Sequence, residues 1–368
     1  MSAERNTQLD GWRAFAVLGV MWHHWAPEEW RGKFPFEIGL FFFLTLTGFL
    51  IGRVLLREKH AGDAIGSPWR LRAYGYFMKR RLTRILIPCY AAMLFAMLVG
   101  ASDIVAHPWL YLGHVSNFHM TYLPGWPSGT AHYWTLAIQM QMYLLFPLLI
   151  YWVPMRWLGW ALVGFSALSP VSRWVCEAFF PSVLHPQAIT LCAFDYFGIG
   201  ALLAWTLAKG VPAGDGRWRR VGLVGLAGYL VLRGFEDFSS PVPGFRYFQQ
   251  TCIAVVFSAL ISETQAGWRG WWGKLLDHPA IQHIGKLSYG LYLFHTPMPL
   301  LIGFVLPGLW HPFFEGPGMI LRLGAFGLAS WGAAYLCWRF LERAGQPARL
   351  HPPVTDGSLR PLGVHVEK

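Results

Sequence analysis

Ten long apolar runs dominate this sequence, and they leave few folds open to it. The runs lie at about residues 12–28, 35–56, 85–102, 134–154, 156–175, 189–208, 219–235, 247–263, 285–306 and 319–341. A helix needs about 20 mostly apolar residues to cross a bilayer, and each run is long enough or nearly so. Lipid offers the backbone no hydrogen-bond partners, so only helices and closed barrels span it. The sequence therefore predicts an all-α, polytopic membrane helix bundle with about ten transmembrane helices.

Composition agrees with this prediction. Hydrophobic residues make up 54% of the chain and charged residues only 13%, about half of the charged share usual in soluble proteins. Two segments are less regular. The run 156–175 contains Pro170 and Arg173, and the segment 104–123 is apolar enough to hold a further short or re-entrant piece.

Basic residues predict the orientation of the bundle. Nine of them lie between residues 53 and 84, namely Arg53, Arg57, Lys59, Arg70, Arg72, Lys79, Arg80, Arg81 and Arg84. Cytoplasmic loops carry an excess of Lys and Arg, so this concentration is predicted to face the cytoplasm. The loop 103–133 contains neither Lys nor Arg and is predicted to lie outside. With ten spans, both termini are then cytoplasmic.

The same basic loops account for the net charge of +11, so no nucleic-acid partner is predicted. No soluble stretch is long enough for a second domain. We expect a membrane domain over residues 1–344, followed by a flexible cytoplasmic tail over residues 345–368 that is rich in proline.

Cysteine and histidine spacing predicts no metal centre. The five cysteines form no Cys-x-x-Cys pair, which argues against both a disulfide framework and a zinc site. His107, His114, His119 and His132 gather in the predicted outer loop, but their spacing is not the compact one of metal ligands. We expect these histidines to be exposed to solvent or to bind an acceptor.

The first apolar run carries an arginine near one end and a histidine near the other. Arg13 and His24 are eleven positions apart, which is about 16 Å along a helix axis. Ionisable side chains are costly inside a membrane and by default mark a functional site.

Residues Leu9 to Ala14 read LDGWRA, and Arg13 and His24 form an R-x10-H pattern. This opening resembles that of the acyltransferase-3 family, integral membrane acyltransferases that O-acylate cell-surface polysaccharides, lipids and some antibiotics. The resemblance implies a protein of the bacterial cytoplasmic (inner) membrane with no bound cofactor. It also implies acyl-CoA, most simply acetyl-CoA, as donor and a glycan or lipid-linked acceptor. Polysaccharide assembly machinery is a further possible partner.

Two more motifs support the resemblance. Residues 41–50, FFFLTLTGFL, resemble the family's FFVLSGFL, with Thr47 in place of serine. Arg81 and Arg84 match the family's RxxR pattern ahead of a span. They are three residues apart and share a helix face, and guanidinium groups bind phosphate bidentately. The resemblance implies that both meet acyl-CoA, whereas anchoring on the cytoplasmic side would also explain them.

Residues 132–147 resemble the family's HxWSLxVExQFYLLxP and include Trp134 and Tyr143. The family's glutamate is replaced by Gln139, which can orient a substrate or a histidine but cannot take a proton. Asp10, Glu37 and Asp195 are the candidates to supply the missing acid.

Two later segments place polar groups in apolar helices. Asp195 lies in a run that resembles the family's small-residue helix, where it needs a partner such as an arginine; a structural and a catalytic role are both open. Ser288, Tyr292 and His295 belong to SYGLYLFH, which resembles the family's SYxxYLxH. Their spacings of four and three predict one polar face, for interhelical hydrogen bonds or for substrate contact.

We expect acyl-CoA to dock with its phosphates near Arg81, Arg84 and Arg13 and to extend its pantetheine arm into the bundle. His24 would act as general base on an acceptor hydroxyl from the outer side. His23 points about 100° away on an ideal helix and is the second choice, and a covalent acyl-histidine is an alternative route. A transporter or flippase of an acylated glycan or lipid, and a non-catalytic scaffold, are the competing interpretations. We expect no SGNH-type partner domain.

Overall fold

The computed structural model describes residues 6–31, 35–66, 69–237, 246–307 and 317–342. These residues are almost wholly helical, and no strand occurs among them, so the predicted all-α class is confirmed. The helices are α1 (Thr7–Trp25), α2 (Glu28–Arg31), α3 (Ile38–Ile65), α4 (Arg70–Leu98), α5 (Ser102–Ala106), α6 (Pro108–Leu112), α7 (Ser116–Met120), α8 (Tyr133–Trp152), α9 (Met155–Phe179), η1 (Pro186–Ala188), η2 (Thr190–Ala193), α10 (Phe194–Ala208), α11 (Gly216–Asp237), η3 (Arg246–Phe248), α12 (Gln249–Ala266), α13 (Gly270–Leu276), α14 (Pro279–Phe294), α15 (Met298–Val305), α16 (Pro317–Cys337) and η5 (Trp338–Glu342).

Each of the ten predicted apolar runs overlaps at least one helix of the structure. Five helices among the described residues are long and apolar enough to cross a membrane. They are α3, α4, α8, the η2–α10 segment and the α16–η5 segment. The remaining runs correspond to α1, α9, α11, α12 and α14. The protein is thus a multi-pass helical membrane protein, while the count of ten spans and the side of each terminus stay predictions.

Two boundaries differ from the sequence expectation. The third predicted span is part of α4, which begins at Arg70 rather than near residue 85, so the basic residues directly ahead of the apolar run are helical and not in a loop. The predicted run 285–306 is divided into α14 and α15, because Pro297 has no backbone N–H to continue a helix. The segment 104–123, expected to hold a short piece, contains α6, α7 and most of α5. The predicted tail lies outside the described residues.

The ends of the first helix and of α14 are defined by local chemistry. Asn6 caps α1 by accepting a hydrogen bond from the backbone N–H of Gln8 at 3.1 Å, the role in which Asn is strongly favoured. Pro279 occupies the first turn of α14, where a missing N–H costs nothing. Both helices therefore start in a defined register, which decides which residues face the centre of the bundle.

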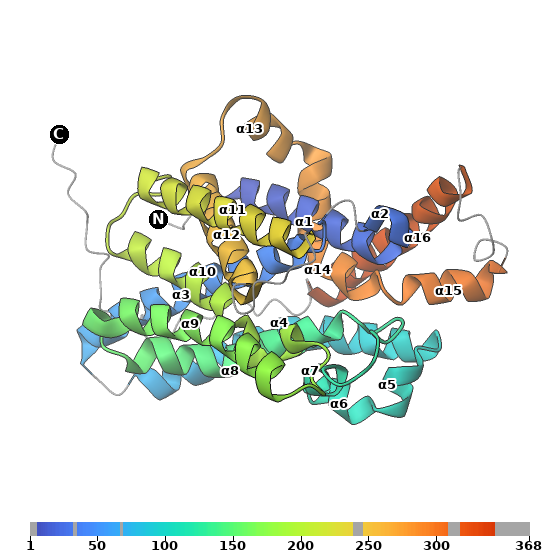
Figure 1. The fold of residues 1–368 in the computed structure, drawn as a ribbon, viewed down its shortest axis with the longest axis horizontal. Helices are drawn as coiled ribbons and strands as arrows, with labels where there is room; N and C mark the ends of the chain where they lie inside the picture. The colour runs from blue at the N-terminus through green and yellow to red at the C-terminus, as the bar shows by residue number, and fades with distance from the viewer. Residues whose placement is uncertain (1–5, 32–34, 67–68, 238–245, 308–316, 343–368) are drawn as a thin grey trace.

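Glycines allow the helices of the centre to approach closely. A Cβ on Gly285 of α14 would collide with the backbone oxygen of Asp10 on α1, and one on Gly48 of α3 would collide with the backbone of Phe197 on α10. Small residues at such crossings are typical of membrane helix pairs. In Figure 1 the short helices α5 to α7 gather at one end of the bundle, and α13 stands off at its edge. The close approach of α1 and α14 at Asp10 and Gly285 lies three residues before Arg13 on one helix and three before Ser288 on the other.

Candidate functional site

A cavity of 530 Å³ opens between helices α1, α3, α4, α8, α14 and η5. Its lining includes most of the polar residues that the sequence singled out. They are Arg13, Thr47, Arg81, Arg84, Gln139, Tyr143, Ser288 and Tyr292. These residues lie up to 279 positions apart, from Arg13 to Tyr292, so the fold gathers the separate motifs around one space.

The cavity is strongly cationic. Arg13, Arg81, Arg84 and Lys286 line it, against the single carboxylate of Glu342. Within the described part of the chain, none of Arg81, Arg84 and Lys286 is engaged in an ion pair. A cavity lined by one sign of charge concentrates ligands of the opposite sign, so this one is suited to a polyanion.

Asp10 belongs to the same end of the cavity through Arg13. Its Oδ1 lies 2.9 Å from Nη1 of Arg13, and its side chain is 5% exposed against 24% for the arginine. A carboxylate three residues earlier on the same helix face fixes the direction of the guanidinium group. Asp10 thus orients Arg13, and this ion pair, rather than a contact with a histidine, is the interaction that the structure shows for its carboxylate.

Arg81 and Gln139 meet at Tyr143. The guanidinium group of Arg81 lies over the Phe77 ring at 5.5 Å and over the Tyr143 ring at 5.8 Å, within the range of cation–π attraction. The Gln139 amide lies 2.6 Å from the Tyr143 hydroxyl and 3.4 Å from that of Thr47. The position where the family carries glutamate therefore belongs to the arginine end of the cavity.

Tyr292 marks another part of the lining. The hydroxyls of Tyr292 and Thr135 lie 2.5 Å apart, and both are within hydrogen-bond distance of the backbone oxygen of His132, at 3.3 Å and 2.8 Å. The Tyr292 ring also lies 5.4 Å from the rings of His132 and His295. Through Tyr292, the cavity reaches a group of buried histidines.

His295 is held in one tautomer. Its Nδ1 lies 2.7 Å from the backbone oxygen of Tyr292. A carbonyl oxygen only accepts, so Nδ1 carries the hydrogen and Nε2 carries the lone pair. The His295 side chain is 0% exposed, and its Nε2 has no hydrogen-bond partner among the described residues. Buried polar atoms are nearly always paired, and an unpaired imidazole nitrogen is free to accept a proton or a substrate hydrogen.

His24 contacts His295 but not the cavity itself. Its ring centroid lies 4.9 Å from that of His295 in a T-shaped arrangement. The His24 side chain is exposed and is absent from the cavity lining. Arg13 and His24 do lie on one unbroken helix, α1. The structure therefore places a buried histidine between the cationic cavity and the exposed one.

Of the three candidate acids, only Glu37 lies at the histidines. Its carboxylate is 3.7 Å from Nδ1 of His23, and the His23 ring is 5.7 Å from that of His24. Asp195 is instead fully buried and paired with Arg173 at 2.8 Å, which gives it a structural partner away from the cavity.

The remaining site candidate, Trp134, also lies outside the cavity lining. It is buried and stacks on Trp126 with ring centroids 5.8 Å apart.

Two of the outer-loop histidines are not exposed to solvent as predicted. His132 is 2% exposed and His114 is 8% exposed. His132 packs against His295 with ring centroids 5.2 Å apart. His132 is the first residue of the motif at 132–147, and this position indicates that it belongs with the helix of the motif rather than with the outer loop. Nothing in the sequence marked Glu342 or Lys286 as cavity residues, because Glu342 stands among the basic residues Arg339 and Arg343 at the end of a run and Lys286 is a single charge at the start of another.

Comparison with known proteins agrees with the motifs. The acyltransferase domain of the acyltransferase-3 family matches residues 6–339. The chain is similar to the peptidoglycan O-acetyltransferase OatA of Listeria monocytogenes, with 25% identity over 365 residues that cover 91% of this chain and 54% of the relative. It is also similar to the O-acetyltransferase OatA of Staphylococcus aureus, with 23% identity over 332 residues that cover 80% and 50%.

The chain spans about half the length of these curated relatives. No solved structure matches it. The family match nonetheless takes in nearly the whole helical bundle, including every residue of the cavity except Glu342. The resemblance seen in the motifs is confirmed, and the chain belongs to the acyltransferase-3 family.

Proposed function

We propose that this protein transfers an acyl group, most simply acetyl, from cytoplasmic acyl-CoA to a hydroxyl of a cell-surface glycan. The bacterial cytoplasmic membrane is the expected location, and the names of the relatives make peptidoglycan the first acceptor to test. The observation that carries the proposal is the cationic cavity, which leads from three arginines to Tyr292 beside the His295–His24 pair.

The donor is inferred from charge and length. Acyl-CoA carries its negative charge on the nucleotide, and four cations against one carboxylate favour such a group at the arginine end. From Arg13 to His24 the axis of α1 measures about 16 Å, on the order of an extended pantetheine arm. The nucleotide can therefore stay at the cytoplasmic end while the thioester enters the bundle, and no phosphate has to be placed in hydrocarbon.

The acceptor is inferred to arrive at the exposed His24. In the proposed step, His24 takes the proton of the acceptor hydroxyl as that oxygen attacks the thioester carbon. The carbon–sulfur bond breaks, the acyl group becomes an ester on the glycan, and the protonated imidazole returns its proton to the thiolate of CoA. His295, fixed through its Nδ1–H, positions His24 at the end of the donor route.

The Glu37–His23 pair is the alternative base. A carboxylate beside an imidazole is the usual way to orient a catalytic histidine and to stabilise its protonated form, and the 3.7 Å separation permits that with a small movement. The two assignments make opposite predictions for single substitutions.

The test uses the purified protein in liposomes with labelled acetyl-CoA and a peptidoglycan fragment as acceptor. His24→Ala should lower kcat by at least about 100-fold, the usual contribution of general acid–base catalysis, while His23→Ala should retain most of it. If His24→Ala keeps full transfer and His23→Ala abolishes it, the assignment is wrong. Release of free CoA thiol is followed in parallel, because a carrier without chemistry would release none.

A further inference from the structure

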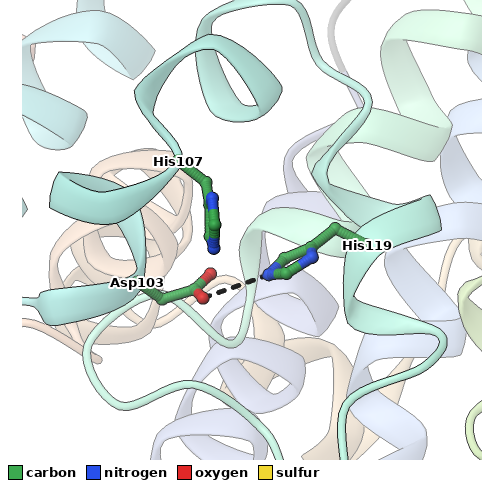
Figure 2. A group of neighbouring side chains, drawn as sticks. All are labelled: Asp103, His107 and His119. Atoms are coloured by element: carbon green, nitrogen blue, oxygen red, sulfur yellow. Dashed lines mark hydrogen bonds and ion pairs between the residues drawn. The ribbon is translucent and has the colours of Figure 1, made fainter.

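Three side chains of the outer segment converge on one point away from the cavity. Asp103 lies on α5, His107 follows the last residue of α5, and His119 lies on α7. One ligand atom from each lies within 4.8 Å of the others. Figure 2 shows the three groups facing one another, with the Asp103 carboxylate bonded to His119. In the sequence the three residues are four and twelve positions apart, which is not a compact ligand spacing. The fold nevertheless brings their ligand atoms together.

The distances match those between ligands of one metal ion. Zinc binds imidazole nitrogen and carboxylate oxygen at about 2.0–2.1 Å in tetrahedral geometry, which puts neighbouring donors about 3.3 Å apart. Nε2 of His119 lies 3.1 Å from Oδ1 of Asp103, and the rings of His107 and His119 are 4.6 Å apart. With a small movement of His107 toward the other two side chains, one ion can therefore replace the hydrogen bond between His119 and Asp103.

The carboxylate is already held from behind. The buried Tyr111 donates its hydroxyl hydrogen to Oδ2 of Asp103, and Oδ1 faces His119. The Tyr111 hydroxyl also lies 3.1 Å from Oγ1 of Thr130. Outer partners of this kind fix ligand orientation at metal sites, and their removal typically weakens metal affinity 10- to 100-fold.

We propose that Asp103, His107 and His119 form a binding site for one divalent transition metal ion, with Zn²⁺ as the first candidate. Two imidazoles and a carboxylate suit zinc better than calcium or magnesium, which prefer oxygen ligands. His107 is exposed and the other two ligands are partly exposed, so water completes the coordination on the outer side. The ion joins α5 to α7 and stabilises the segment that leads through Thr130 to His132.

The experiment measures Zn²⁺ binding to the full chain in detergent by calorimetry after treatment with a chelator. We expect one Zn²⁺ per chain and a melting temperature that rises on addition of zinc. His107→Gln should weaken binding at least tenfold and abolish the rise. This variant is informative because no side-chain hydrogen bond of His107 is found among the described residues, so the metal-free protein should melt as the wild type does.

His60→Gln is the matched control, since it removes an exposed histidine from α3. It should bind zinc as the wild type does. Tyr111→Phe should weaken binding through Asp103 without removing a ligand. The proposal is overturned if the wild type binds no zinc stoichiometrically, or if His107→Gln and His60→Gln bind it equally well. Because the readout is binding and melting, failure here leaves the acyl-transfer proposal untouched.

Discussion

Substitution of Arg81 and Arg84, the two arginines of α4 that line the cavity, tests the proposed donor site most directly. Arg81→Gln and Arg84→Gln each remove one cation from the same helix face, but the two positions differ in exposure. Arg81 is partly buried against the rings of Phe77 and Tyr143, whereas Arg84 is exposed. Electrostatic attraction grows as water is excluded, from about 1 kcal/mol for two unit charges 4 Å apart in water to about 4 kcal/mol at an effective dielectric constant of 20.

These positions set the expected magnitudes. A hydrogen bond to a charged group contributes about 1.5–3 kcal/mol, and every 1.4 kcal/mol is a factor of ten in affinity. Arg81→Gln should therefore raise the KM for acetyl-CoA about 10- to 150-fold. Arg84→Gln, at the aqueous limit of about 1 kcal/mol, should raise it about fivefold, and added salt should reduce that smaller effect.

The assay determines KM and kcat for acetyl-CoA in liposomes, together with the inhibition constant of free CoA. The inhibition constant is needed because KM equals a dissociation constant only when chemistry is slow. Arg53→Gln is the control, since Arg53 is an exposed arginine that bonds Gln265 outside the cavity. Arg81→Lys keeps the charge but loses the planar guanidinium group, so its KM for acetyl-CoA should lie between those of the wild type and Arg81→Gln. The reasoning is refuted if Arg81→Gln lowers kcat alone and leaves both KM and CoA inhibition unchanged.

Three further predictions concern stability, measured by unfolding of the purified protein. Gly285→Ala should cost about 1–3 kcal/mol, as overpacking does, because its Cβ meets the α1 backbone; Gly164→Ala, which meets open space, should cost far less, and equal losses would contradict the close crossing. Arg173→Met should cost about 3–5 kcal/mol by leaving the buried Asp195 carboxylate without its counter-charge, and the double variant with Asp195→Leu should recover most of it; no recovery would mean that the pair is not the cause. Burial lowers the pKa of His114 from 6.5 to about 4. The unfolded chain then binds more protons between these pH values, so stability should fall by up to about 3 kcal/mol as pH drops from 6.5 to 4. His114→Gln should flatten this slope relative to wild type, and parallel profiles would exclude the assignment.

The features that sequence predicted well are those set by local periodicity. Ser288 and Tyr292 are four residues apart on one helix, and both line the cavity. Arg81 and Arg84 are three apart and also share it. A helix of 3.6 residues per turn makes such pairs neighbours in any fold. Run length likewise located the helices, because the need to bury backbone polar groups in lipid leaves little alternative.

Helix boundaries, and contacts between helices far apart in the sequence, were not predictable. The N-terminal part of α4 is helical but basic, so a search for apolar runs places the start of this helix too late. Glu37, at the start of α3, approaches His23 on α1, and no spacing rule encodes this contact. Proline was an unreliable guide to helix ends, since Pro147 and Pro170 lie inside helices while Pro297 separates two.

The exchange of the family's glutamate for Gln139 becomes intelligible from its surroundings. Gln139 bonds Tyr143, and Tyr143 lies under Arg81. A carboxylate at this position would lie near Arg81 and offset part of the positive charge of the cavity. An amide keeps the cavity cationic, as the proposed binding of an anionic donor requires. Because Gln139 cannot take a proton, the proposed mechanism assigns the proton of the acceptor to the group formed by His23, His24 and His295, beside which Glu37 lies.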